Sequence, residues 1–188
     1  MNFLIMHGTM GSPDGNWFPW MKAQLEALGH HVWLPRFPTP ENQNYTSWRS
    51  VAMQALHDLD PSQTILIGHS MGCALSFRLA EEADRPYRAI FAVAPFIDKT
   101  GVPEFDPLVV TFIEHAFDWA RVKKGAGVYH LYAGDNDPYV SPELTRRVED
   151  ALGQPVTFVP GGGHLNAEFG YTSFPLLLQD VLAEVGGD

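Results

Sequence analysis

The sequence predicts an α/β fold, with one domain over residues 1–188, about six parallel strands, helices on both faces and no large lid. Short apolar runs alternate with amphipathic segments along the whole chain, which is the pattern of repeated strand–helix units. Several runs are apolar at successive positions, as strands covered on both faces require. The length of 188 residues fits one domain, and the 45% hydrophobic content is sufficient for an ordinary core.

Six short apolar runs are the expected strands. The fourth run, which contains Ile90, Phe91 and Val93, is too continuous for a strand with one face in water. Turn-forming residues follow several runs, which sets where those strands end. The six expected strands are Phe3–Met6, His31–Leu34, Thr64–Ile67, Ala89–Ala94, Val128–Ala133 and Val156–Val159.

Helical spacing of apolar residues appears between these runs. The first expected helix starts at Trp17 and stops at Gly29, which suits a helix C-terminus. Ser141-Pro142-Glu143 predicts another helix start, with the serine hydroxyl as its cap. The last helix, from Phe174 to Val185, has the clearest apolar face. The other expected helices are Trp48–Leu59, Ala74–Ala83 and Leu108–Phe117.

Charge and composition exclude several classes of function. With 22 acidic and 12 basic residues the net charge is −10, and no dense Lys/Arg cluster exists to bind nucleic acid or an anionic membrane. Cys73 is the only cysteine, so no internal disulfide can form. No apolar stretch reaches 18 residues, and the N-terminus does not resemble a signal peptide. We therefore expect a soluble, cytoplasmic protein without nucleic-acid or membrane partners.

The strongest chemical motif is Gly68-His69-Ser70-Met71-Gly72, a G-x-S-x-G match between an expected strand and an expected helix. In that context the serine occupies a strained turn, which the flanking glycines make possible and which lifts its Oγ above the sheet. The motif is short, and Ser70 as a plain helix cap is the alternative. The strand–turn–helix context favours a catalytic nucleophile.

A serine hydroxyl needs a base to take its proton. Of the eight histidines, His164 is the best candidate, because it lies in a glycine-rich loop after the last expected strand. His69 is expected to be packed or bonded to the backbone, and His7 to shape the first turn. The histidines form no metal-binding constellation.

The third residue should be a carboxylate that orients the imidazole. Asp137 follows the fifth expected strand and is our first choice. Asp135, which could instead brace the turn, and Asp98, after the fourth strand, remain alternatives. The chain order Ser70, Asp137, His164 is that of the α/β hydrolases.

Negative charge that develops on a carbonyl oxygen needs preorganised donors. The backbone N–H of Met71 is one candidate, and Gly8 or Thr9 should supply the second. Both groups converge if the first and third strands are neighbours. The turn after the first strand fails the sequence tests for a phosphate-binding loop, since it has no lysine and no G-x-G-x-x-G pattern. We expect no metal and no organic cofactor.

Several of these segments together resemble the small serine hydrolases related to retinoblastoma-binding protein nine. The resemblance extends from Phe3 to about Gly170, and it implies a compact α/β-hydrolase fold with Ser70, Asp137 and His164 as the triad. It also implies carboxylesterase-like or aminopeptidase-like activity. The segments that carry it are His7-Gly8-Thr9, Gly15-Asn16-Trp17-Phe18-Pro19-Trp20, Pro38, Gly68–Gly72, Gly134–Val140 and Gly162-Gly163-His164.

One property of that family is not expected here. The mammalian member is named for binding retinoblastoma protein through an L-x-C-x-E motif. Cys73 stands in Gly72-Cys73-Ala74-Leu75, which does not match that motif. The retinoblastoma partner is therefore not carried over.

The expected function is hydrolysis of small esters or amides through an acyl-enzyme on Ser70. Pro95–Phe117 and Pro35–Asn44 are the two segments long enough to overhang the site, so we expect a shallow, fairly open cleft. One alternative is a protein-binding module that keeps the fold without catalysis. Another is a cofactor-free haloperoxidase or C–C hydrolase with the same triad.

Overall fold

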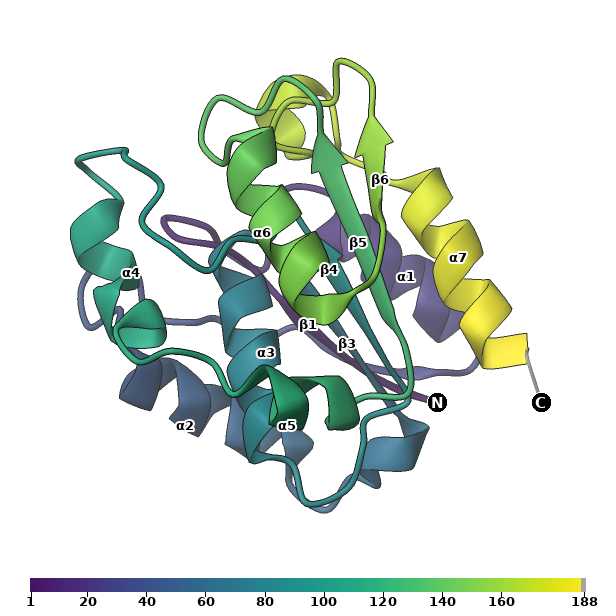
Figure 1. Ribbon diagram of the computed structural model, residues 1–188. Helices are drawn as coiled ribbons and strands as arrows, with labels where there is room; N and C mark the ends of the chain where they lie inside the picture. The colour runs from purple at the N-terminus through teal and green to yellow at the C-terminus, as the bar shows by residue number, and fades with distance from the viewer. Residues whose placement is uncertain (187–188) are drawn as a thin grey trace.

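Six parallel strands form one sheet in the order β2-β1-β3-β4-β5-β6 in the computed structural model, which describes residues 1–186 (Figure 1). The prediction of a parallel sheet with about six strands is confirmed, and each strand lies within two residues of its expected bounds. The strands are β1 (Asn2–Met6), β2 (His31–Trp33), β3 (Thr64–His69), β4 (Ala89–Val93), β5 (Tyr129–Gly134) and β6 (Val156–Val159).

Helices cover both faces of the sheet (Figure 1). One core cluster joins α1 and α7 to the sheet, and a second joins the sheet to α2, α3, α4, α5 and α6 on the opposite face. The helices are α1 (Phe18–Ala27), α2 (Tyr45–Leu56), α3 (Met71–Glu82), α4 (Asp106–Ile113), α5 (Trp119–Lys124), α6 (Pro142–Leu152) and α7 (Pro175–Gly186), with short 3-10 turns η1 (Pro61–Gln63) and η2 (Ala167–Phe169).

The strand order creates a switch point between β1 and β3. From β1 the chain crosses to β2 on one side, and from β3 it continues to β4 on the other. Met6 pairs with Gly68, so the turn after β1 and the turn after β3 lie side by side. Open α/β sheets bind ligands at this position, at the carboxyl ends of their strands.

One helix prediction was wrong at its boundary, and one predicted side-chain cap was wrong. The helix expected at Trp48–Leu59 begins at Tyr45, because the Asn44 side chain caps it by accepting a hydrogen bond from the N–H of Ser47 at 2.9 Å. Ser141 makes no side-chain capping bond, so only its place before Pro142 matches the predicted helix start.

The helix expected at Leu108–Phe117 begins at Asp106 and ends at Ile113, as α4, and a further helix, α5, begins at Trp119, beyond the expected range. Arg78 ends α4, since its side chain donates to the carbonyl of Phe112 at 3.0 Å and also to that of His115. The next helix, α5, starts where Asp118 accepts from two backbone N–H groups at 3.1 Å each. A long-range side-chain contact therefore marks the end of α4, and a local side-chain cap marks the start of α5.

No helix in residues 1–186 is long and apolar enough to cross a membrane.

Candidate active site

Ser70 lies at the turn between β3 and α3, with its backbone at φ 55° and ψ −119°. Its N–H donates to the carbonyl of Val93 at 2.8 Å, which ties this turn to the end of β4. The flanking glycines permit the sharp turn: a Cβ on Gly68 would lie 2.6 Å from the carbonyl carbon of Gly72, and one on Gly72 would lie 2.4 Å from the carbonyl oxygen of Met6. The helix therefore begins at Met71, directly after the serine, rather than at Ala74.

His164 and Asp137 meet through a hydrogen bond between Nδ1 and Oδ2 of 2.7 Å. The second carboxylate oxygen accepts from the backbone N–H groups of Tyr139 at 2.8 Å and Val140 at 3.0 Å. The Asp137 side chain has no exposed surface. Because an ionised carboxylate can only accept, this bond requires a proton on Nδ1, and Nε2 is the ring nitrogen that is not bonded to Asp137.

The two other candidate acids lie elsewhere. Asp98 forms an ion pair of 2.7 Å with Arg147 at the surface. Asp135 accepts a hydrogen bond from the N–H of Gly161 at 2.8 Å and so braces the turn. The structure thus brings Asp137, and neither Asp98 nor Asp135, to the imidazole of His164.

His69 and His7 are both buried and bonded to backbone, which was the expectation for His69, whereas His7 was expected to shape the first turn. His69 Nε2 donates to the carbonyl of His164 at 2.9 Å, and burial together with the neighbouring His164 lowers the pKa of His69 to about 3. His7 donates from Nδ1 to the carbonyl of Gly8 at 2.8 Å and accepts at Nε2 from the N–H of Phe37 at 3.0 Å. Burial also lowers the pKa of His7. Both rings are therefore neutral supports for neighbouring loops.

The loop that carries His164 is held at three further points. Trp17 Nε1 donates to the carbonyl of Leu165 at 3.0 Å, and Asn16 Oδ1 accepts from the N–H of Ala167 at 3.0 Å. Asn136 Oδ1 accepts from the N–H of Gly163 at 2.7 Å. Sequence reasoning did not assign these roles, although the Asn-Trp pair belongs to the Asn-Trp-Phe-Pro-Trp stretch.

The turn after β1 brings Gly8 against the serine. A Cβ on Gly8 would lie 2.8 Å from the Ser70 Cβ, so the backbone of this turn closely approaches the hydroxyl group. Gln43 donates to Thr9 Oγ1 at 2.8 Å, and the N–H of Met10 donates to Thr39 Oγ1 at 2.8 Å. These bonds fix the position of the turn.

The segment Pro35–Asn44, one of the two that are long enough to overhang the site, does not overhang it. Within the described residues it contributes none of the cleft lining. Phe37 is buried in the core, and Trp48 Nε1 donates to the carbonyl of Pro38 at 2.7 Å, so the segment lies against the α2 face. It supports the turn after β1 through the hydrogen bonds of Thr39 and Gln43.

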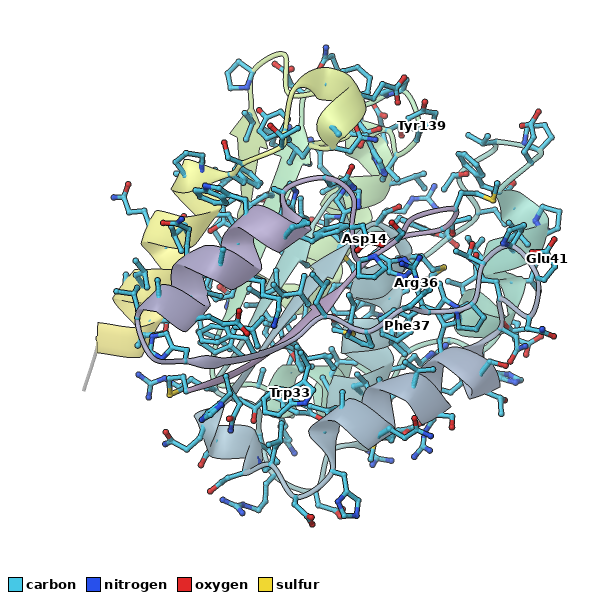
Figure 2. All side chains as sticks on the ribbon, turned by 180° about the vertical axis from the view of Figure 1, so that it is seen from behind. Asp14, Trp33, Arg36, Phe37, Glu41 and Tyr139 are labelled. Carbon is cyan, nitrogen blue, oxygen red and sulfur yellow. The ribbon has the colours of Figure 1, made fainter. Side chains whose placement is uncertain are left out.

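A cleft of about 270 Å³ opens beside Ser70 and His164. The segment Pro95–Phe117 overhangs it as predicted, through residues of its loop and of α4. Figure 2 shows Tyr139 at the same end of the molecule, beside the η2 turn. The lining residues are Gly8, Thr9, Met10, Gly11, Asn16, His69, Ser70, Phe96, Thr100, Phe105, Val109, Tyr139, Val140, His164, Asn166 and Glu168.

Residues 1–186 contain no group of three or more His, Cys, Asp or Glu side chains arranged to hold a metal ion. Cys73 is fully buried, and burial raises the pKa of its thiol. Its sulfur lies 3.2 Å from the carbonyls of Gly68 and Val93. Cys73 thus packs as a small core residue, as predicted.

A parallel sheet with this strand order, and a serine at a strained turn between its third strand and the next helix, define an α/β hydrolase. The chain belongs to the serine hydrolase family, whose sequence model matches residues 3–183. It is 28% identical over 184 residues to the YdeN protein of Bacillus subtilis, covering 95% of this chain and 92% of YdeN. It is 23% identical over 155 residues to the serine hydrolase RBBP9 of Rattus norvegicus, covering 81% of this chain and 80% of that protein.

Solved structures share the fold. The crystal structure of the Bacillus subtilis YdeN gene product superposes with a TM-score of 0.89 at 24% identity and covers 98% of both chains. The monoacylglycerol lipase of Paleococcus ferrophilus superposes with a TM-score of 0.74 at 15% identity, covering 97% of this chain and 94% of the lipase. At these identities the likeness concerns the fold alone.

Proposed function

We propose that this protein is a carboxylesterase-like serine hydrolase that cleaves small esters, and also amides, through an acyl-enzyme on Ser70. One observation carries the proposal. The imidazole of His164 is bound through Nδ1 to the buried carboxylate of Asp137, and it lines the same cleft as the Ser70 hydroxyl. The nucleophile, base and orienting acid of a serine hydrolase would then be Ser70, His164 and Asp137.

In the proposed reaction the Ser70 Oγ attacks the carbonyl carbon, and His164 Nε2 takes the hydroxyl proton. The imidazolium returns that proton to the leaving alcohol or amine, and the acyl group stays on Ser70. Water then repeats the sequence, with His164 again as base, and releases the acid. Asp137 keeps the imidazole in the required tautomer and stabilises its cation.

The oxyanion would form between two backbone turns. The Met71 N–H is at the first position of α3, where helical N–H groups have no partner within the helix. The turn at Gly8 and Thr9 lies beside it, because β1 and β3 are neighbours. Donors fixed in this way stabilise charge on the carbonyl oxygen without reorganising during the reaction.

The size of the cleft favours small substrates. Its volume of about 270 Å³ lies just below the range of about 300–1,000 Å³ for ligand pockets. Structural relatives include a monoacylglycerol lipase and the lipolytic enzymes LipS and LipT, which act on esters by their names. A short acyl ester fits both observations.

A serine-reactive fluorophosphonate probe tests the proposal. We expect labelling of the wild-type protein and of a Ser141→Ala control, and none of Ser70→Ala, because only Ser70 has the activated hydroxyl. The wild-type protein and Ser141→Ala should also hydrolyse p-nitrophenyl butyrate, and Ser70→Ala should not. A folded wild-type protein that takes no label at pH 8 would instead favour a non-catalytic binding module.

A further inference from the structure

The cleft beside Ser70 has one apolar wall. Phe96 and Phe105 come from the segment after β4, Val109 from α4, and Val140 from the loop after β5. Phe96, Val109 and Val140 belong to the core cluster on the α2–α6 face of the sheet, so this wall is continuous with packed core. It is suited to a small hydrocarbon group.

A second part of the lining, the acceptor wall, contains hydrogen-bond acceptors from the loop after β6. The side-chain oxygen of Asn166 is buried and has no hydrogen-bond partner among the described residues. Glu168 accepts at Oε2 from the hydroxyl of Tyr139 at 2.9 Å, which holds its carboxylate at the rim of the cleft. No lysine or arginine occurs among the described residues that line the cleft. This wall therefore attracts a cationic hydrogen-bond donor and repels an anion.

The residues of the acceptor wall follow His164 closely in the sequence. In the proposed reaction His164 delivers a proton to the leaving group, so the leaving group must lie on the side of His164. Asn166 and Glu168 follow His164 in the same loop, and the Tyr139 ring contacts the imidazole edge-on, with centroids 5.2 Å apart. A leaving group that takes its proton from His164 would lie near the Tyr139–Glu168 pair, which leaves the apolar wall for the acyl chain.

We propose that the preferred substrates are esters of amino alcohols, with an ammonium group on the leaving alcohol and a small apolar acyl group. This inference rests on the proposed function and adds the substrate class. Glu168 supplies the charge and accepts from the ammonium N–H. Esters with an anionic leaving group are disfavoured by the same wall.

The test compares two esters of nearly equal shape at pH 7. In 2-(dimethylamino)ethyl butyrate the leaving alcohol carries a protonated amine, and 3-methylbutyl butyrate has carbon in place of that nitrogen. We expect the wild-type kcat/KM to be about two- to fivefold higher for the cationic ester, the size of an exposed charge pair. The ratio should fall towards one in 0.5 M salt, where such interactions are screened.

Two variants locate the effect. Glu168→Gln should bring the ratio of kcat/KM values close to one, because it removes the charge and keeps the size of the side chain. Asp150→Asn removes the same charge from an exposed position on α6 and should retain the wild-type ratio.

A third substrate, the 3-methylbutyl ester of 4-(dimethylamino)butanoic acid, carries the cation on the acyl side. Its kcat/KM with the wild-type protein should be lower than that of 3-methylbutyl butyrate.

The results distinguish a failure of the proposed substrate class from a failure of the proposed esterase function. Fluorophosphonate labelling of Ser70 with a wild-type ratio of one or less, or a preference for the acyl-side cation, overturns the substrate class and leaves the esterase proposal standing. Absence of both labelling and ester hydrolysis overturns both.

Discussion

Three histidines near the carboxyl ends of the strands have different properties because their ring nitrogens have different partners. His7 and His69 are bonded to backbone groups, and burial lowers the pKa of each. His164 is bonded on one nitrogen to a carboxylate, and its ring borders the cleft. At the residue scale, the surroundings rather than the residue type decide which imidazole is available as a base.

Asp137→Asn tests the orienting role within the proposed function. An amide at this position offers an N–H towards Nδ1, which favours the tautomer with its proton on Nε2 and removes the basic lone pair. We expect kcat to fall on the order of 10⁴-fold while the fold persists. Steady-state kinetics and circular dichroism measure the two effects. Full activity in the folded variant would contradict the assignment.

His69 makes the stability of the protein sensitive to acid. Its pKa of about 3 in the folded state lies below the usual 6.5, so the native state resists protonation. The corresponding stabilisation is complete above about pH 6.5 and is lost as the pH falls towards 3. Between pH 7 and pH 5 this loss is about 2 kcal/mol.

The measurement is urea unfolding at pH 7 and pH 5 for the wild type and His69→Gln. The glutamine amide can still donate to the carbonyl of His164, but it does not titrate. The decrease in unfolding free energy between the two pH values should therefore be about 2 kcal/mol smaller in the variant. Equal decreases would show that His69 does not titrate in this way.

Much of the site could be predicted at this scale. The G-x-S-x-G pattern identified Ser70, and the position of His164 after the last strand made it the best candidate base. The sequence ranked Asp137 first but could not exclude Asp98 and Asp135, because all three follow strands. Asn16, Asn136 and Glu168 were missed, since their roles depend on partners far away in the chain.

At the scale of elements, close backbone packing joins β1, β3 and α3. Gly68 and Gly72 let the first turn of α3 lie against the two strand ends, which in turn sets where Ser70 and Met71 stand. The strands were predictable from continuous apolar runs. The starts of α2 and α5 were not, because side-chain caps at Asn44 and Asp118 determine them.

Gly72→Ala should push α3 away from β1. The new Cβ would lie 2.4 Å from the carbonyl oxygen of Met6, which is backbone and cannot swing aside. We expect a loss of about 1–3 kcal/mol in unfolding free energy, as for other overpacked sites, with a large loss of esterase activity. Gly15→Ala is the matched control, because its nearest contact is an ordinary 3.6 Å. A stable, active Gly72→Ala protein would contradict this account.

The whole molecule consists of one sheet with a separate core on each face. The α1–α7 face includes the fully buried side chains of Phe174, Leu177 and Val181. The site lies where both cores reach the carboxyl ends of the strands. The sequence did not predict the order of the strands in the sheet, because an apolar run indicates a strand but not the strands that pair with it.

Two adjacent leucines of α7 test how much this face contributes. Leu177 is fully buried, whereas 39% of the Leu176 surface is exposed. We expect Leu177→Ala to lower the unfolding free energy by about 2–5 kcal/mol and Leu176→Ala by less than about 1 kcal/mol. Chemical denaturation followed by tryptophan fluorescence gives both values. Equal effects would mean that α7 does not dock through this face.

The backbone conformation of Ser70 lowers the stability of the folded protein. Its φ and ψ fall in the region that glycine dominates in tight turns, and a residue with a Cβ is held there at a cost. In urea unfolding, the unfolding free energy of Ser70→Gly should therefore be about 1 kcal/mol higher than that of Ser70→Ala. Neither variant can form an acyl-enzyme. Under the proposed function, stability and reactivity therefore favour different residues at position 70.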